Sequence, residues 1–267
     1  MKSTENHIAR RVAASAEPSP LTGLRDMLAT AFAADIAAVT PMVCDVLRDE
    51  IRVTSAPAQR DFIRTALVIL ARQSGDLALG VAQEFRSRFD ATLVSASKAR
   101  EDHTPGSGLS LMDETHVEID IALMQCATRL KEQAAADLFQ VTARIAAMLD
   151  RPMLDEGENP VAPLELARAL MQALARMDFH EKQRLIVFKA FDPALLCIVP
   201  DLYQHANGLL AEVGVLPEFK AQYGRPVISR PAQSPRENAA LDEPALAAIL
   251  HRLLNGQRPP AHVQVNI

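Results

Sequence analysis

The residues with the clearest potential for binding chemistry are three cations in the most distinctive part of the chain. Lys182, Arg184 and Lys189 lie in the apolar segment between Asp178 and Pro217. Ammonium and guanidinium groups bind carboxylates and phosphates, so these residues are candidates for docking an acidic partner or ligand. We favour the alternative, in which their stems pack on a helix and their charged heads are solvated.

Two acid–histidine pairs have the spacing of metal ligands on one helix face. Asp113 and His116 are three residues apart, and Asp201 and His205 are four apart. A di-metal site in a helical bundle needs further carboxylates and two Glu-x-x-His motifs, which the sequence lacks. We therefore interpret both pairs as surface residues, and we expect no metal and no cofactor.

Other catalytic or binding patterns are weak. Arg48/Arg52 and Arg60/Arg64 have the Arg-x-x-x-Arg spacing of some dinucleotide receptors, but the accompanying Asn/Asp-x-Ser-x-x-Gly element is missing, so solvated helix faces are expected. No Gly-x-Ser-x-Gly elbow occurs. We therefore predict no catalytic residue, and the protein is not expected to be an enzyme.

The three cysteines point to a reducing environment. Cys44, Cys126 and Cys197 lie far apart at apolar positions, their number is odd, and no Cys-x-x-Cys motif occurs. We expect reduced core residues in a cytoplasmic protein. The N-terminus has no apolar signal segment, and the longest apolar run, Ala66 to Ala71, is too short to span a membrane.

Composition predicts an all-α, multi-helix bundle of antiparallel amphipathic helices with disordered N- and C-terminal tails. Ala and Leu dominate the 267 residues, aromatic residues are 4%, and Trp is absent. A net charge of −5 gives no reason to expect nucleic-acid binding. Composition predicts five segments. They are a disordered tail at 1–20, a helical region at 21–97, a linker at 98–108, a second helical domain at 109–220, and a mobile tail at 221–267 with one short helix at 241–254.

The candidate cations are expected on a helical hairpin. Asp178 has the spacing of an N-cap, and Asp192-Pro193 is typical of one helix ending and the next beginning. Pro200 should kink the second helix. In the preceding domain, Val117, Ile121, Leu123 and Met124 are expected to form the buried face of a helix.

Four pieces of sequence resemble a bacterial family known only as domain of unknown function sixteen thirty-one. They are LSLMDE at 109–114, the PLELARAL region between Asn159 and Leu170, RLIVFKAF at 184–191, and LYQHANGLLAEVGVLP at 202–217. The resemblance extends over about 109–226. Members are usually much longer, so the resemblance implies that this chain is a short member or a fragment-like relative.

The resemblance implies no established activity. Members are sometimes labelled thymidine phosphorylase, but the chain has no glycine-rich phosphate loop to support that label. We expect a non-enzymatic module that binds protein, either its own kind or another, in regulation. The alternatives are a small-ligand or nucleotide-binding regulator that uses Arg184 and Lys189, and an enzyme whose site lies between helices.

Overall fold

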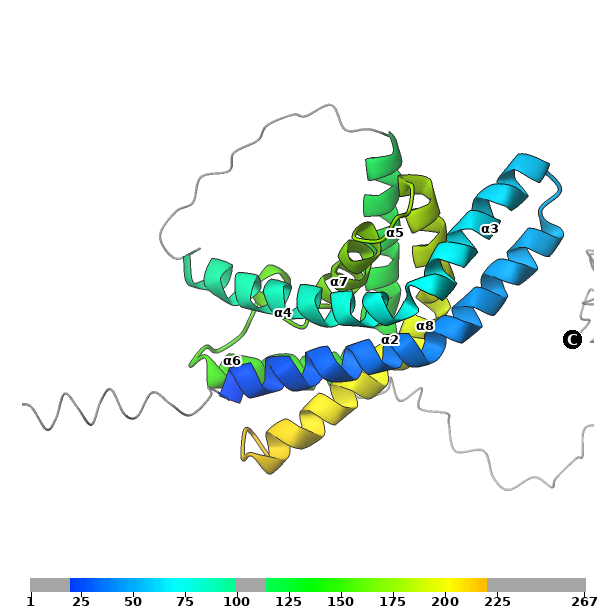
Figure 1. Ribbon diagram of the computed structural model, residues 1–267. Helices are drawn as coiled ribbons and strands as arrows, with labels where there is room; N and C mark the ends of the chain where they lie inside the picture. The colour runs from blue at the N-terminus through cyan, green and yellow to red at the C-terminus, as the bar shows by residue number, and fades with distance from the viewer. Residues whose placement is uncertain (1–19, 99–113, 220–267) are drawn as a thin grey trace, which may run out of the picture. The chain divides into compact units, whose positions relative to one another are not determined.

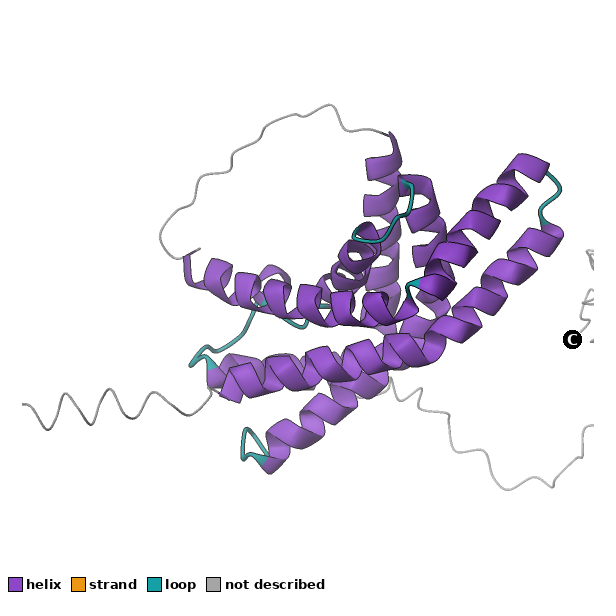
Figure 2. Cartoon of the chain, viewed as in Figure 1, coloured by secondary structure: helices purple, strands orange, loops and turns teal. Residues whose placement is uncertain are grey.

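The computed structural model describes residues 20–98 and 114–219, and all regular elements in these ranges are helices (Figures 1 and 2). The predicted all-α fold is therefore confirmed. These residues belong to one compact unit, Met1–Tyr223. The predicted tails, most of the linker and the predicted helix at 241–254 lie outside the described residues. The elements are α2 (Pro20–Val53), α3 (Pro57–Arg72), α4 (Ser74–Lys98), α5 (Glu114–Gln133), α6 (Ala135–Met148), the 3₁₀ turn η1 (Glu156–Glu158), α7 (Pro163–Ala175) and α8 (Glu181–Glu212).

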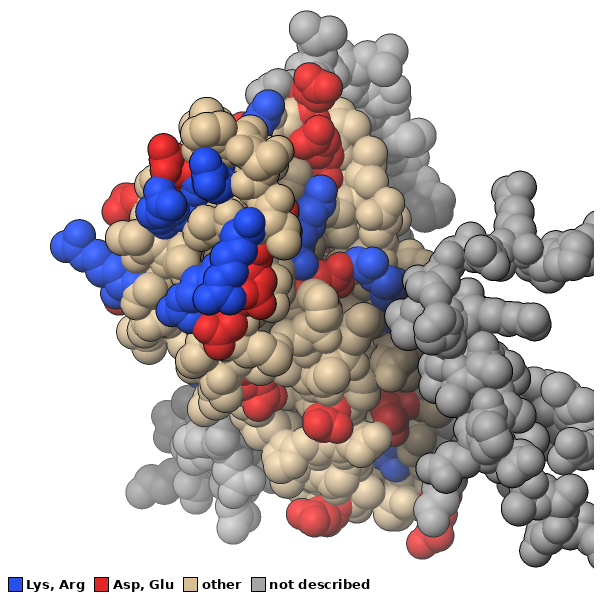
Figure 3. Space-filling model, turned by 90° about the vertical axis from the view of Figure 1, so that its right-hand side faces the viewer, with Lys and Arg blue, Asp and Glu red and all other residues tan. Residues whose placement is uncertain are grey.

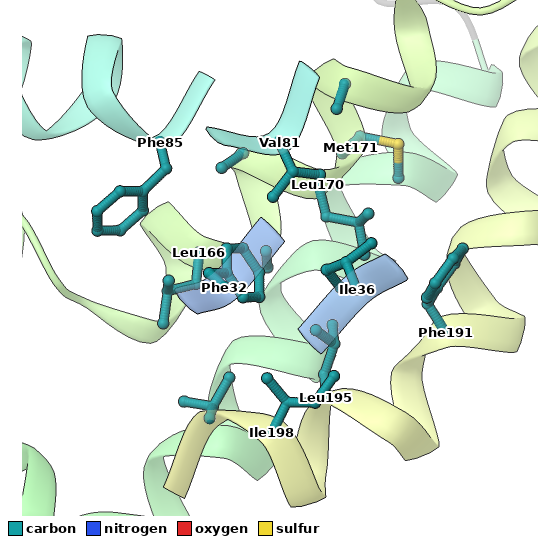
Figure 4. Packing of buried hydrophobic residues seen from close by; sticks show 14 of the residues in the cluster. Phe32, Ile36, Val81, Phe85, Leu166, Leu170, Met171, Phe191, Leu195 and Ile198 are labelled. Atoms are coloured by element: carbon teal, nitrogen blue, oxygen red, sulfur yellow. The ribbon is translucent and has the colours of Figure 1, made fainter. Parts of the chain in front are cut away.

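The core lies where α2, α4, α7 and α8 meet. Figure 4 shows large apolar side chains from all four helices in one cluster. Phe32 of α2 meets Phe85 of α4 edge to face, with ring centroids 6.4 Å apart. Helices on both sides of residues 99–113 contribute to this core, because α4 packs on α7 and α5 packs on both α7 and α8.

Helix α2 is continuous through a proline. The sequence is compatible with two helices or with one interrupted at Thr40-Pro41, and the structure has a single helix of 34 residues. The Thr40 hydroxyl donates to the Ile36 carbonyl at 2.7 Å, so this buried side chain has its hydrogen-bond partner within the helix. By length and composition α2 could also cross a membrane, a property it shares with core helices of helical proteins. The predicted absence of a membrane span stays a prediction.

The apolar run after Pro57 forms two helices, although its periodicity predicts one. The chain turns at Gln73, where α3 ends, and Ser74 begins α4. Gln73 Nε2 donates to Asp178 Oδ2 at 3.1 Å, which ties this turn to the segment before α8. The break allows α3 to pack on α2 and α8 while α4 packs on α2 and α7.

Helix α8 is one helix, so the predicted hairpin is wrong. It begins after the N-cap His180, and Pro193 and Pro200 both lie inside it. The Asp192 carboxylate pairs with Arg129 of α5 and does not cap a new helix. Each proline removes one backbone N–H from the helix. At Pro193 the carbonyl that loses its partner is that of Lys189, and both residues are exposed. Water can satisfy that carbonyl while the opposite side of α8 stays packed.

The expected buried face of α5 is correct for Leu123 and wrong for the other three residues. Val117, Ile121 and Met124 are exposed. The buried positions of α5 are Thr115, Ile119, Ala122, Leu123, Cys126, Ala127 and Leu130. Apolar residues follow both faces, so helical spacing alone did not distinguish the buried face from the exposed one.

Helices α4 and α7 approach each other closely at Gly80, which gives a test of the packing. A Cβ atom at Gly80 would lie 3.3 Å from Ala173 Cβ, whereas a Cβ at Gly75 has no neighbour within 4 Å. We expect Gly80→Leu to lower the free energy of unfolding by about 1–3 kcal/mol through overpacking. Gly75→Ala should be neutral or stabilising by up to about 1 kcal/mol. Urea denaturation of both variants measures the difference, and equal stabilities would contradict the close approach.

Candidate functional site

A cleft of about 590 Å³ opens beside α6 and is the candidate functional site. Its walls come from α6, from the segment between α6 and α7, and from the residues that follow α8. Most of the lining is apolar. The side chains that define it are Leu138, Phe139, Ala143, Ala146, Ala147, Met153, Leu154, Leu216 and Phe219.

The hollow follows from the residues of α6. This helix buries Leu138, Val141 and Ile145 in the core. Ala143 and Ala146 stand on the side of the cleft, and alanine has no atoms beyond Cβ to fill the space. Phe139 is exposed at the edge, and its ring lies 5.9 Å from that of Phe219. Small side chains therefore line one part of the cleft, and two aromatic rings stand at its edge.

The polar groups of the cleft wall bond to one another. Asn159 is buried; its Nδ2 donates to Thr142 Oγ1 at 2.8 Å, and its Oδ1 accepts from the Val161 amide at 3.0 Å. The Thr142 hydroxyl donates to the Leu138 carbonyl. Behind this wall the Tyr203 hydroxyl donates to the Val161 carbonyl at 2.6 Å, and burial raises the pKa of Tyr203. These bonds fix the segment that leads into α7.

Arg144 holds the other wall in place. Only 3% of this residue is exposed. Its Nη1 donates to Asn207 Oδ1 at 2.7 Å. Its remaining nitrogens donate to the carbonyls of Val215, Leu216 and Phe219 at 3.2, 3.4 and 3.1 Å. Burial lowers the pKa of the guanidinium.

The wall that Arg144 holds has an unusual backbone. Gly214 has φ +84° and Leu216 has φ +46°, so the chain turns twice through the left-handed region after α8. Glycine adopts this conformation freely, whereas leucine does so at a cost. Hydrogen bonds from one buried guanidinium to three carbonyls of this turn offset that cost and place Leu216 and Phe219 at the cleft.

The charged residues at the rim are paired. Lys131 Nζ lies 2.6 Å from Glu156 Oε2, and Arg151 Nη1 lies 3.1 Å from Glu158 Oε1. Each cation has a carboxylate beside it, so the rim carries little net charge. A site with these walls suits apolar groups and offers no set of convergent ionisable side chains for proton transfer.

The three sequence-predicted docking residues lie on α8 and do not form one cluster. Lys182 and Lys189 are exposed and seven residues apart, which places them on the same side of the helix. Arg184 is half-buried on nearly the opposite side, with Nη2 3.6 Å from Glu181 Oε1. Its buried Nε has no hydrogen-bond partner. A docking role for these residues stays a prediction.

The other candidate patterns also lie on surfaces. Arg48, Arg52 and Arg64 each pair with the aspartate three residues earlier. Figure 3 shows such alternating charges on the side of the molecule where α3 and the end of α2 lie in Figure 1. Asp201 and His205 are exposed near Asp35, whose pKa is raised first by burial and then by Asp201. Among the described residues no group of three or more His, Cys, Asp or Glu side chains is placed to hold a metal, and Asp113 lies outside them.

Sequence reasoning missed Arg144 and therefore the cleft. A signal was present, because Arg144 interrupts the apolar run at the spacing of the buried positions Val141 and Ile145. A cation on the buried face of a helix indicates a buried polar partner. The partners themselves, three carbonyls beyond α8, have no sequence signal.

The described residues form an all-helical fold with an apolar cleft. The model of the family described as "Protein of unknown function (DUF1631) N-terminal domain" matches residues 16–214. The chain therefore belongs to this family. The match includes the helices before residue 100, which the four sequence pieces did not reach, and it ends before residue 226. No match was found among curated proteins or among solved structures.

Removing Arg144 tests whether it supports the cleft wall. Arg144→Ala leaves Asn207 Oδ1 and the carbonyls of Val215, Leu216 and Phe219 without their donor. We expect the free energy of unfolding to fall by about 3 kcal/mol. Arg52→Ala, which removes an exposed ion pair, should change it by less than about 0.5 kcal/mol. Chemical denaturation measures both, and equal effects would show that Arg144 is not a structural anchor.

The thiols give a second test of burial. Cys44 and Cys126 are buried, and burial raises the pKa of both thiols; the neighbouring Asp192 raises that of Cys126 further. Cys197 is exposed, so the expectation of three core cysteines is wrong for this residue. We expect one thiol of the native chain to react rapidly with a disulfide reagent at pH 8. Cys197→Ser should abolish the fast phase, and a fast phase that persists would contradict the buried positions.

Proposed function

We propose that the protein is a non-enzymatic helical module that binds apolar side chains of a partner protein in the cleft beside α6. One observation carries the proposal: the cleft is apolar, and its polar wall groups are already bonded to one another. Thr142 and Asn159 bond each other, and Lys131 and Arg151 have carboxylate partners. Binding there would gain free energy from apolar burial and would leave these bonds in place.

We propose a helix of the partner protein as the occupant of the cleft. Phe139, Met153 and Leu216 are exposed around its edge, at 41%, 71% and 40% of their surfaces. Helices that bind in apolar grooves present large apolar side chains at positions i, i+3 or i+4, and i+7. We propose a partner helix with Leu, Met or Phe at these positions, with binding in the cytoplasm and a regulatory role.

A second candidate is a small apolar ligand, and the cleft volume favours it. Binding sites for small molecules occupy about 300–1,000 Å³, and this cleft holds about 590 Å³. A nucleotide is a poorer fit for the cleft, because Lys131 and Arg151 at its rim already face Glu156 and Glu158. The two candidates share the surface and differ in the size of the occupant.

Site-specific photo-crosslinking tests the proposal. A benzophenone amino acid replaces Phe139 at the cleft or, as a matched control, Leu79, which is 73% exposed on α4. After irradiation in a lysate of the native host, we expect a discrete protein adduct from position 139 and none from position 79. Met153→Asp in the same chain should remove the adduct, because it places a charge in the apolar site.

Two results would count against a protein partner. Adducts of equal yield from both positions would indicate non-specific capture. A lack of adducts, together with a saturable thermal shift by an apolar small molecule that Met153→Asp abolishes, would favour the second candidate.

A further inference from the structure

The cleft beside α6 lies where the described part of the chain ends. Leu216 and Phe219 line the cleft, and Phe219 is the last residue that the structure describes. The ring of Phe219 lies 5.9 Å from that of Phe139, which stands at the edge of the cleft. The sequence that follows Phe219 is therefore attached to the chain at the apolar surface to which we assign a partner helix.

The sequence after Phe219 contains a segment with the apolar spacing of a helix that binds in a groove. Within residues 241–254, four large apolar side chains stand at positions i, i+3, i+4 and i+7: Leu246, Ile249, Leu250 and Leu253. This is the spacing that we infer for the partner helix of the cleft. Pro244 favours a helix start before these residues, and Asn255-Gly256 favours an end after them.

A helix in segment 241–254 needs an apolar surface to be stable. The segment has fourteen residues, a length at which an isolated helix is marginal in water. Its apolar residues lie on one side of the helical wheel, whereas Ala248, His251 and Arg252 lie on the other. The cleft supplies an apolar surface, because Lys131 and Arg151 at its rim are already paired with carboxylates.

The length of the connection favours the chain's own segment over that of another chain. Residues 220–245 join Phe219 to Leu246, and a coil of 26 residues has an end-to-end distance of about 28 Å. A tether of this kind gives an effective concentration on the order of 1 mM at the cleft. At about 1 µM protein this is about a thousandfold above the concentration of the same segment on other chains.

We propose that segment 241–254 binds in the cleft of its own chain and regulates the cleft by competing with the partner protein. The inference rests on the proposed function, because the segment occupies the site assigned to the partner helix. Its apolar side chains lie over Ala143 and Ala146, where small side chains leave room. The bond between Asn159 and Thr142 and the ion pairs of the rim stay in place.

The expected size of the competition follows from the effective concentration. If the free segment binds the cleft with a Kd of about 0.1 mM, tethering at about 1 mM leaves the cleft open in about one chain in eleven. The apparent affinity for the partner is then reduced about tenfold. A segment that no longer binds should restore that affinity without any change in the cleft.

Photo-crosslinking of the purified 267-residue chain tests whether the segment occupies the cleft. With a benzophenone amino acid in place of Phe139, irradiation at about 1 µM should join position 139 to a residue of segment 241–254 in a product of single-chain mass. Proteolysis and mass spectrometry locate the bond. Leu250→Asp should abolish this product, because it places a charge in the apolar contact. Ala248→Asp, on the opposite side of the segment, is the matched control and should retain the product.

The same variants test the competition with a partner. In a lysate of the native host, Leu250→Asp should raise the yield of the partner adduct from position 139 about tenfold, and Ala248→Asp should leave it unchanged. Met153→Asp in the cleft should abolish both the partner adduct and the product within the chain. Circular dichroism should show the same helical fold for all three variants.

Three results would overturn the inference. They are the lack of a bond between position 139 and segment 241–254, a bond that Leu250→Asp leaves unchanged, and products that join only two chains. A partner adduct of equal yield with and without Leu250→Asp would also contradict the inference, but the proposed function would stand. A product within the chain, with no partner adduct even from Leu250→Asp, would show instead that the segment binds the cleft and that the proposed function is wrong.

Discussion

The structure depends on α8 remaining one helix through Pro193 and Pro200. Helices α2, α3, α5, α6 and α7 all pack against it. A break at Asp192-Pro193 would separate Phe188 and Phe191 from Leu195 and Val199, which now lie in one core. The missing N–H groups cost little on the exposed side, whereas dividing the core would expose several large side chains. Tertiary burial therefore outweighs the local preference for a turn.

The same balance explains how much of the fold could be predicted from sequence. The helical class follows from composition and from apolar spacing, and the break near Ala134 falls where that spacing weakens. The hairpin at Asp192 was wrong because a capping residue acts as a cap only when its carboxylate is free, and Asp192 pairs with Arg129. Helix ends are local features, but the partners that override them are distant in sequence.

The candidate site was less accessible from sequence than the fold. Lys182 and Lys189 are exposed on one side of α8, and Arg184 is half-buried on nearly the opposite side. Arg144 contacts residues that are 63 to 75 positions away. The buried face of α5 could not be identified either, because Val117 and Ile119 are both apolar and both fit a helical period. Each of these features is a relation between elements, and sequence patterns report mainly on single elements.

The pairing of the charges at the cleft determines how binding there would respond to salt. At the cleft Lys131 and Arg151 already have carboxylate partners, so binding there would depend on apolar burial and would respond weakly to salt. Helix α8 supports the cleft, since the turn after its last residue is held by Arg144. That turn places Leu216 at the cleft in a left-handed conformation, so a change in the shape of the cleft would require the turn at Gly214 and Leu216 to move.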